Sequence, residues 1–203
     1  MNSAFSEEQR DCLQELINVA MGLASDKLAR FLNTFVHLQV PAIELVASER
    51  ILFQSESRYA SVDAALVSQG FLGPAGLRGE AIVLYQLENA HRIAALLGYE
   101  TDSSSELEML TDISSVLTTT FLNGLAEQID YSLSYSAPRV LPLRQQKVSD
   151  ALRETACHWE MALQVDIRYQ LIDHSFNCDM LLLIPGEAVL AIQQILNRVL
   201  EEY

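Results

Sequence analysis

The stretch DCLQELINVAMG occupies residues 11–22. Apolar residues within it and beyond it recur at intervals of three and four, a spacing that predicts an amphipathic helix over residues 6–35 with one face turned to a core. Ser6 is the expected N-cap, and Pro41 excludes a longer helix. The apolar positions are Leu13, Ile17, Ala20, Ala24, Leu28, Phe31 and Phe35.

The opposite side of this helix carries a polar stripe. Because each helical residue advances about 100°, Asp11, Glu15, Asn18 and Gly22 share one face, and Ser25 extends the stripe. A glycine inside a helix costs about 1 kcal/mol relative to alanine, and one reason to keep it is that a partner approaches the helix closely. A carboxamide beside a carboxylate can orient a water molecule and hold a cation of a partner.

The remaining elements follow in an order that occurs twice. After the first helix, the sequence predicts strands at residues 42–46, 61–71 and 77–85, with a hairpin turn between the last two, and a helix at 88–97. A second long helix is predicted over 106–130. It is followed by strand-like residues 131–143, a short helix at 146–156, strands at 159–172 and 178–184, and a helix at 187–202.

An internal duplication explains this order. At a constant offset, Leu13 aligns with Leu110 and Pro41 with Pro138. We therefore expect an α/β fold of one domain over residues 1–203, with half-repeats at about 6–98 and 105–203. The sheet should be mainly antiparallel, with two long helices packed on it around a pseudo-two-fold axis.

Composition limits the classes of partner. The chain has 203 residues, 13 Lys and Arg against 27 Asp and Glu, and a net charge of −14. A surface this acidic disfavours nucleic acids and anionic membranes. No apolar run reaches the ~20 residues of a membrane helix, and the polar start MNSAFSEEQR is unlike a secretory signal. We therefore expect a cytoplasmic protein.

Other constellations of reactive residues are weak. The glycines at 70, 73, 76 and 79 fit no phosphate-binding loop. Neither the histidines nor the cysteines have metal-ligand spacing, although Cys157 with His158, and His174 with Cys178, leave a thiol or metal site open. The odd number of cysteines, with Cys12 the third, disfavours a disulfide framework.

The segment DCLQELINVAMGLA and the later HLQVPAIELV together resemble the CheC/CheX/FliY family of chemotaxis phosphatases over essentially the whole chain. The resemblance implies dephosphorylation of a CheY-type response regulator. Asn18 would enter the regulator's active site and position the attacking water, and Glu15 would pair with a lysine of the regulator. Asp11, Gly22 and Ser25 would contact the same partner. The regulator would supply the aspartyl phosphate and Mg²⁺, so this chain is expected to bind no cofactor itself.

The second half departs from that pattern. Asp112 stands at the position of Glu15, and Ser115, too short to place an amide, stands at the position of Asn18. We therefore expect one working site and a degenerate second one. The departure also leaves a second interpretation of the function open. In it, the chain is a non-catalytic module of the same fold that docks a receiver domain, a CheD-like partner or a flagellar-switch component. The sequence leaves the oligomeric state undetermined.

Overall fold

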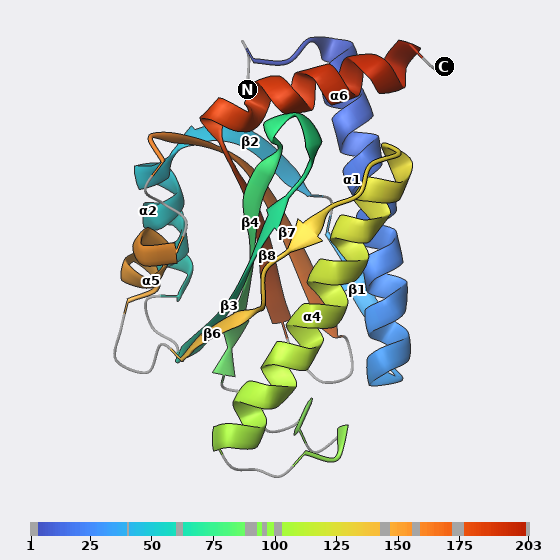
Figure 1. The fold of residues 1–203 in the computed structure, drawn as a ribbon. Coiled ribbons are helices and arrows are strands. Elements are labelled where there is room, and N and C mark those ends of the chain that lie inside the picture. Colours follow the sequence, from blue (N-terminus) through green and yellow to red (C-terminus); the bar gives the residue numbers. More distant parts are fainter. Residues whose placement is uncertain are drawn as a thin grey trace.

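Helices and pairs of strands alternate along the chain in an order that occurs twice, as the computed structural model shows (Figure 1). The structure describes residues 4–39, 41–59, 63–87, 93–94, 97–99, 103–142, 147–155, 159–171 and 177–201. The first half contains α1 (Glu7–Leu32), β1 (Val36–Leu38), β2 (Ala42–Ala47), α2 (Ser48–Tyr59), β3 (Ala64–Leu72) and β4 (Arg78–Gln86). The second half contains α4 (Ser103–Gln128), β5 (Ser134–Tyr135), β6 (Arg139–Pro142), α5 (Val148–Thr155), β7 (Met161–Leu171), β8 (Asn177–Pro185) and α6 (Val189–Glu201).

One antiparallel sheet joins the two halves. Its strand order is β1-β7-β8-β4-β3-β5, with β2 also paired to β7 and β6 to β3. The central pair, β4 with β8, takes one strand from each half. Each half also lends its short strands to the long strand of the other half, β2 to β7 and β6 to β3. The predicted α/β class, with a mainly antiparallel sheet and two long helices, is confirmed.

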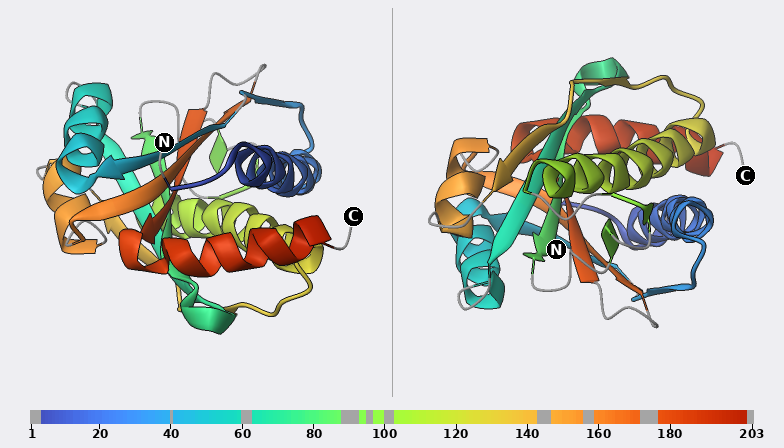
Figure 2. Two further views of the ribbon diagram at one scale, coloured as in Figure 1. Left: turned by 90° about the horizontal axis from the view of Figure 1, so that it is seen from above. Right: turned by 90° about the horizontal axis from the view of Figure 1, so that it is seen from below.

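Helices cover both faces of the sheet (Figure 2). The helices α1, α4 and α6 pack on one face, and α2 and α5 pack on the other. On β4, Val83 and Tyr85 belong to the first apolar layer, whereas Ile82 and Leu84 belong to the second. Because both faces are buried, strands such as β4 and β8 are almost continuously apolar instead of alternating with polar residues.

The helix α1 begins where the sequence predicts and ends earlier than predicted, after Leu32 instead of Phe35. Ser6 is its N-cap and forms a capping box with Gln9. Asn33 adopts a left-handed conformation (φ 49°) and ends the helix after Leu32. The predicted core positions Phe31 and Phe35 are wrong: Phe35 lies beyond the end of the helix and is 79% exposed, and Phe31, in the last turn, is 38% exposed.

The helix α2 was not predicted from the sequence. Its last turn supplies Arg58 and Tyr59, and both side chains bond to the carboxylate of Asp179 on β8, each at 2.9 Å. Arg168 on β7 donates to the other oxygen of the same carboxylate, also at 2.9 Å. Asp179 is only 4% exposed, so its charge is balanced within the protein by two arginines.

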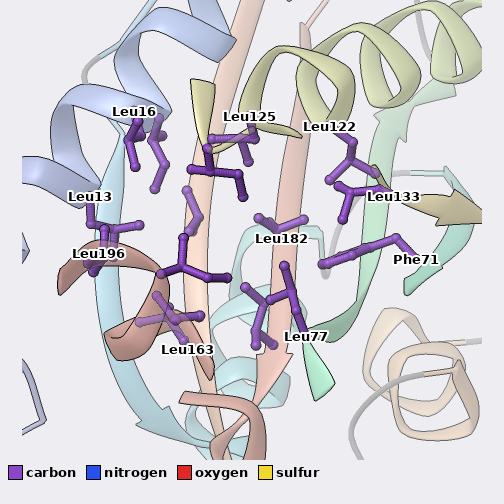
Figure 3. A pocket seen from close by; sticks show the side chains of 16 residues that line it. Leu13, Leu16, Phe71, Leu77, Leu122, Leu125, Leu133, Leu163, Leu182 and Leu196 are labelled. Atoms are coloured by element: carbon purple, nitrogen blue, oxygen red, sulfur yellow. The ribbon is translucent and has the colours of Figure 1, made fainter. Parts of the chain in front are cut away.

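The two long helices lie side by side, in contact (Figure 1). Gly124 on α4 permits this approach, because a Cβ at that position would lie 3.0 Å from Leu23 Cδ1 and 3.3 Å from Ala20 Cα. Between the two long helices, the sheet and α6 lies an apolar cavity of about 70 Å³ (Figure 3). Its lining includes Leu13, Leu122 and Leu196.

Within the described residues, no helix has the length and apolar character needed to cross a bilayer. The predicted helix at 88–97 and the residues Cys157, His158 and His174 fall mostly or wholly outside those ranges.

Candidate functional site

The exposed face of α1 carries the predicted polar stripe. Asp11, Glu15 and Gly22 are exposed and Asn18 is half-buried. Glu15 and Asn18 are three residues apart on one helix, which places their Cβ atoms about 5–6 Å from each other. Among the described residues, Glu15 has no ion-pair partner, so its charge is available to a binding partner.

The amide of Asn18 has a partner within its own helix. Gln14 Nε2 donates a hydrogen bond to Asn18 Oδ1 at 3.2 Å, from one turn earlier. Both side chains are half-buried at the edge of the exposed face. This bond leaves the amide nitrogen of Asn18 and one lone pair of its oxygen free for other partners.

Gly22 leaves the helix backbone accessible in the middle of this face. A Cβ at Gly22 would have no heavy atom within 4 Å, so packing inside the protein does not explain the glycine. Beside it, Val19 and Leu23 are 40% and 46% exposed and form an apolar border. The prediction for Ser25 is wrong, because this side chain is only 8% exposed and does not extend the stripe.

The position on α4 that corresponds to Glu15 is Asp112, and its carboxylate is hydrogen-bonded within the protein. The Tyr99 hydroxyl donates a hydrogen bond to Asp112 Oδ2, and this bond raises the pKa of Tyr99 to about 12. Ser115 is half-buried and brings no amide to the surface. The second half therefore places a shorter, already bonded carboxylate where the first half has the unpaired Glu15.

The described residues of this face of α1 offer positioning and charge. In the described part of the chain, no group of three or more His, Cys, Asp or Glu residues could hold a metal ion. Burial raises the thiol pKa of Cys12 and of Cys178, which keeps both protonated at neutral pH. The exposed face of α1 carries the carboxylate of Glu15, which has no ion-pair partner among the described residues. It also carries the amide of Asn18, which is hydrogen-bonded to Gln14, and accessible backbone at Gly22.

Sequence reasoning missed two of these relationships. The Gln14–Asn18 bond has a sequence signal, because amide pairs four residues apart on a helix do interact. Tyr99 has none, since its hydrogen bond to Asp112 is a contact from outside the helix that helical spacing does not indicate.

The fold is CheC/CheX/FliY-like, as alignment with solved structures of chemotaxis proteins shows. Thermotoga maritima FliY aligns with a TM-score of 0.68 at 15% identity, covering 96% of this chain and 98% of that one. A chain of the CheX-CheY-BeF3-Mg²⁺ complex from Borrelia burgdorferi aligns at 0.56 and 15%, covering 85% and 97%.

The FliM middle domain from H. pylori aligns at 0.61 and 13% identity, covering 94% of this chain and 99% of that one. No protein-family model and no curated protein sequence matches the chain. At these identities the likeness concerns the fold, which is shared by CheX, FliY and FliM chains.

Proposed function

We propose that this protein is a phosphatase that accelerates hydrolysis of the aspartyl phosphate on a CheY-type response regulator. The observation that carries the proposal is the exposed face of α1, where the unpaired Glu15 and the held Asn18 lie together. The similarity of the fold to FliY, and to a complex that contains CheX, CheY, BeF3 and Mg²⁺, supports the same reading.

In this proposal, α1 docks against the phosphorylated active site of the regulator. Glu15 pairs with a lysine of the regulator, and Asp11 and Gly22 contact the surface around it. The carboxamide of Asn18 orients a water molecule in line with the phosphorus atom. An amide suits this task because it has both a donor and an acceptor and does not titrate.

The reaction needs no covalent intermediate on this chain. A new P–O bond forms from the water oxygen, and the P–O bond to the aspartate breaks with its electron pair passing to the carboxylate. The proton of the water leaves with the inorganic phosphate. The regulator supplies Mg²⁺, which balances the phosphoryl charge, and the protein acts where regulators act, in the cytoplasm.

A second function is a non-catalytic module that docks a receiver domain, a CheD-like protein or a flagellar-switch component. The fold by itself does not separate the two functions, because FliM middle domains align as well as the CheX complex chain does. The loss of the amide at Ser115 in the second half also favours a module that keeps only binding there.

The two functions are separated by measuring binding and dephosphorylation with the same variants. A BeF3-activated receiver measures docking, and the phosphorylated receiver measures turnover. The phosphatase account predicts that Asn18→Ala binds the activated receiver within about twofold of wild type but loses turnover. Binding by wild type without any acceleration of phosphate loss would instead establish the docking module.

A further inference from the structure

Gln14 lies one helical turn before Asn18, and its Nε2 donates a hydrogen bond to Asn18 Oδ1 at 3.2 Å. We propose that Gln14 is a positioning residue, which holds the Asn18 carboxamide in the orientation needed for turnover. This inference rests on the proposed phosphatase function. It assigns Gln14 no contact with the phosphoryl group.

The physical basis is the freedom of an asparagine side chain. A half-buried Asn18 without a partner would sample several rotamers, and a half-turn of its amide would exchange the oxygen and the nitrogen. The bond to Gln14 removes part of that freedom before the partner arrives. Such preorganisation raises the rate of a step that depends on aligning a water molecule.

The direction of the bond determines what Asn18 offers. Because Asn18 Oδ1 accepts from Gln14, both hydrogens on Nδ2 stay free, and the oxygen keeps one lone pair. The phosphoryl group is anionic, so N–H donors pointed towards it match its charge. If the Asn18 amide were turned by 180°, Nδ2 would donate one of its hydrogens to Gln14, and Oδ1 would face the phosphoryl group instead.

The second half lacks both members of this pair. Thr111 occupies the position of Gln14, and its hydroxyl donates to Leu107 O at 2.7 Å within its own helix. Ser115 replaces Asn18. The helix α4 therefore lacks both a counterpart of the Gln14 donor and a counterpart of the Asn18 amide.

Three substitutions at Gln14 separate positioning from general structure. Gln14→Leu keeps the size but removes the donor. Gln14→Lys can only donate and so selects the orientation seen here, whereas Gln14→Glu can only accept and selects the reverse. Gln54→Leu is the matched control, since Gln54 is also a half-buried glutamine but lies on α2, across the sheet.

Turnover of the phosphorylated receiver is measured over a range of receiver concentrations to separate kcat from KM. We expect Gln14→Leu and Gln14→Glu to lower kcat by about 3- to 10-fold with little change in KM, because each leaves docking intact and misplaces the amide. Gln14→Lys and Gln54→Leu should keep kcat near that of wild type. Wild-type kcat in Gln14→Leu, or equal losses in the Leu and Lys variants, would overturn the proposal.

A second readout does not depend on activity. Nitrogen relaxation of the Asn18 side-chain amide should indicate order in wild type and Gln54→Leu, and faster motion in Gln14→Leu. Equal mobility in wild type and Gln14→Leu would overturn the positioning role.

The two proposals fail in different ways. If wild type is active and Asn18→Ala is not, an unaffected Gln14→Leu variant removes only the role of Gln14. If wild type itself does not accelerate phosphate loss, the phosphatase function fails, and the catalytic role of Gln14 fails with it.

Discussion

Tyr99 donates its phenolic hydrogen to the carboxylate of Asp112, at the position on α4 that corresponds to Glu15 on α1. The carboxylate of the second half is thus bonded within the protein, whereas the described residues leave Glu15 without an ion-pair partner. In the proposed function, this difference gives the two similar helices different roles: α1 docks the partner, and α4 contributes chiefly to the core and to packing against α1.

The double substitution Asp112→Ala with Ser115→Ala should therefore leave phosphatase activity within about twofold of wild type. The reason is that this pair supplies neither a free carboxylate nor an amide. Receiver dephosphorylation kinetics check this expectation. A loss of activity comparable to that of Asn18→Ala would assign a second working site to α4.

Glu15→Gln should weaken docking more than it slows the bound reaction. The variant keeps the shape of the side chain but loses the charge that, in the proposed complex, pairs with a lysine of the regulator. Because hydrogen bonds to charged groups contribute about 1.5–3 kcal/mol, KM should rise about tenfold or more while kcat changes little.

The control for this prediction is Glu108→Gln, an exposed carboxylate on the first turns of α4. It should leave KM unchanged. A fall in kcat without a rise in KM for Glu15→Gln would give Glu15 a part in the chemical step instead of in docking.

The two helical glycines should respond in opposite ways to larger side chains. Gly22→Ala fills open space and should stabilise the fold by about 0.5–1 kcal/mol through helix propensity. Gly124→Leu forces a side chain against the α1 backbone at Ala20 and should destabilise by about 1–3 kcal/mol. Urea unfolding measures both.

Gly22→Ala also tests the docking face. If the partner approaches the α1 backbone closely at Gly22, the more stable variant should bind the activated receiver more weakly. Unchanged affinity would place the contact surface elsewhere on α1.

The ion pairs that Asp179 makes with Arg58 and Arg168 should matter for stability and not for activity. Asp179→Asn leaves Arg58 and Arg168 without their shared anion. Because both arginines remain partly exposed to water, we expect a loss of about 2–3 kcal/mol in the free energy of unfolding, below the range for fully buried pairs. Tyr59→Phe, which removes one neutral donor to the same carboxylate, should cost about 1 kcal/mol.

The sequence identified α1 because its apolar spacing and its capping residues agree. It did not give the end of the helix, because the apolar spacing continues to Phe35 while Asn33 turns the backbone left-handed. The helix α2 was missed because its apolar spacing is interrupted. Its buried side includes the small polar Ser55 between Ile51 and Tyr59, so the apolar period is interrupted although the face is buried.

The candidate site was predictable to the extent that it is local. Glu15 and Asn18 share a face because they share a helix, and Gln14 could be added by the same spacing. Ser25 was misplaced because it lies at the margin of that face, where packing of the neighbouring elements decides exposure. The bond between Tyr99 and Asp112 joins segments whose approach depends on tertiary structure.

The most direct test is the decay of a phosphorylated CheY-type receiver from the same organism, followed alone, with wild type and with Asn18→Ala. The account predicts that wild type accelerates decay at catalytic concentration and that Asn18→Ala, folded and still able to bind, leaves the decay at the receiver's own rate. Equal acceleration by wild type and Asn18→Ala would contradict the central role assigned to this amide.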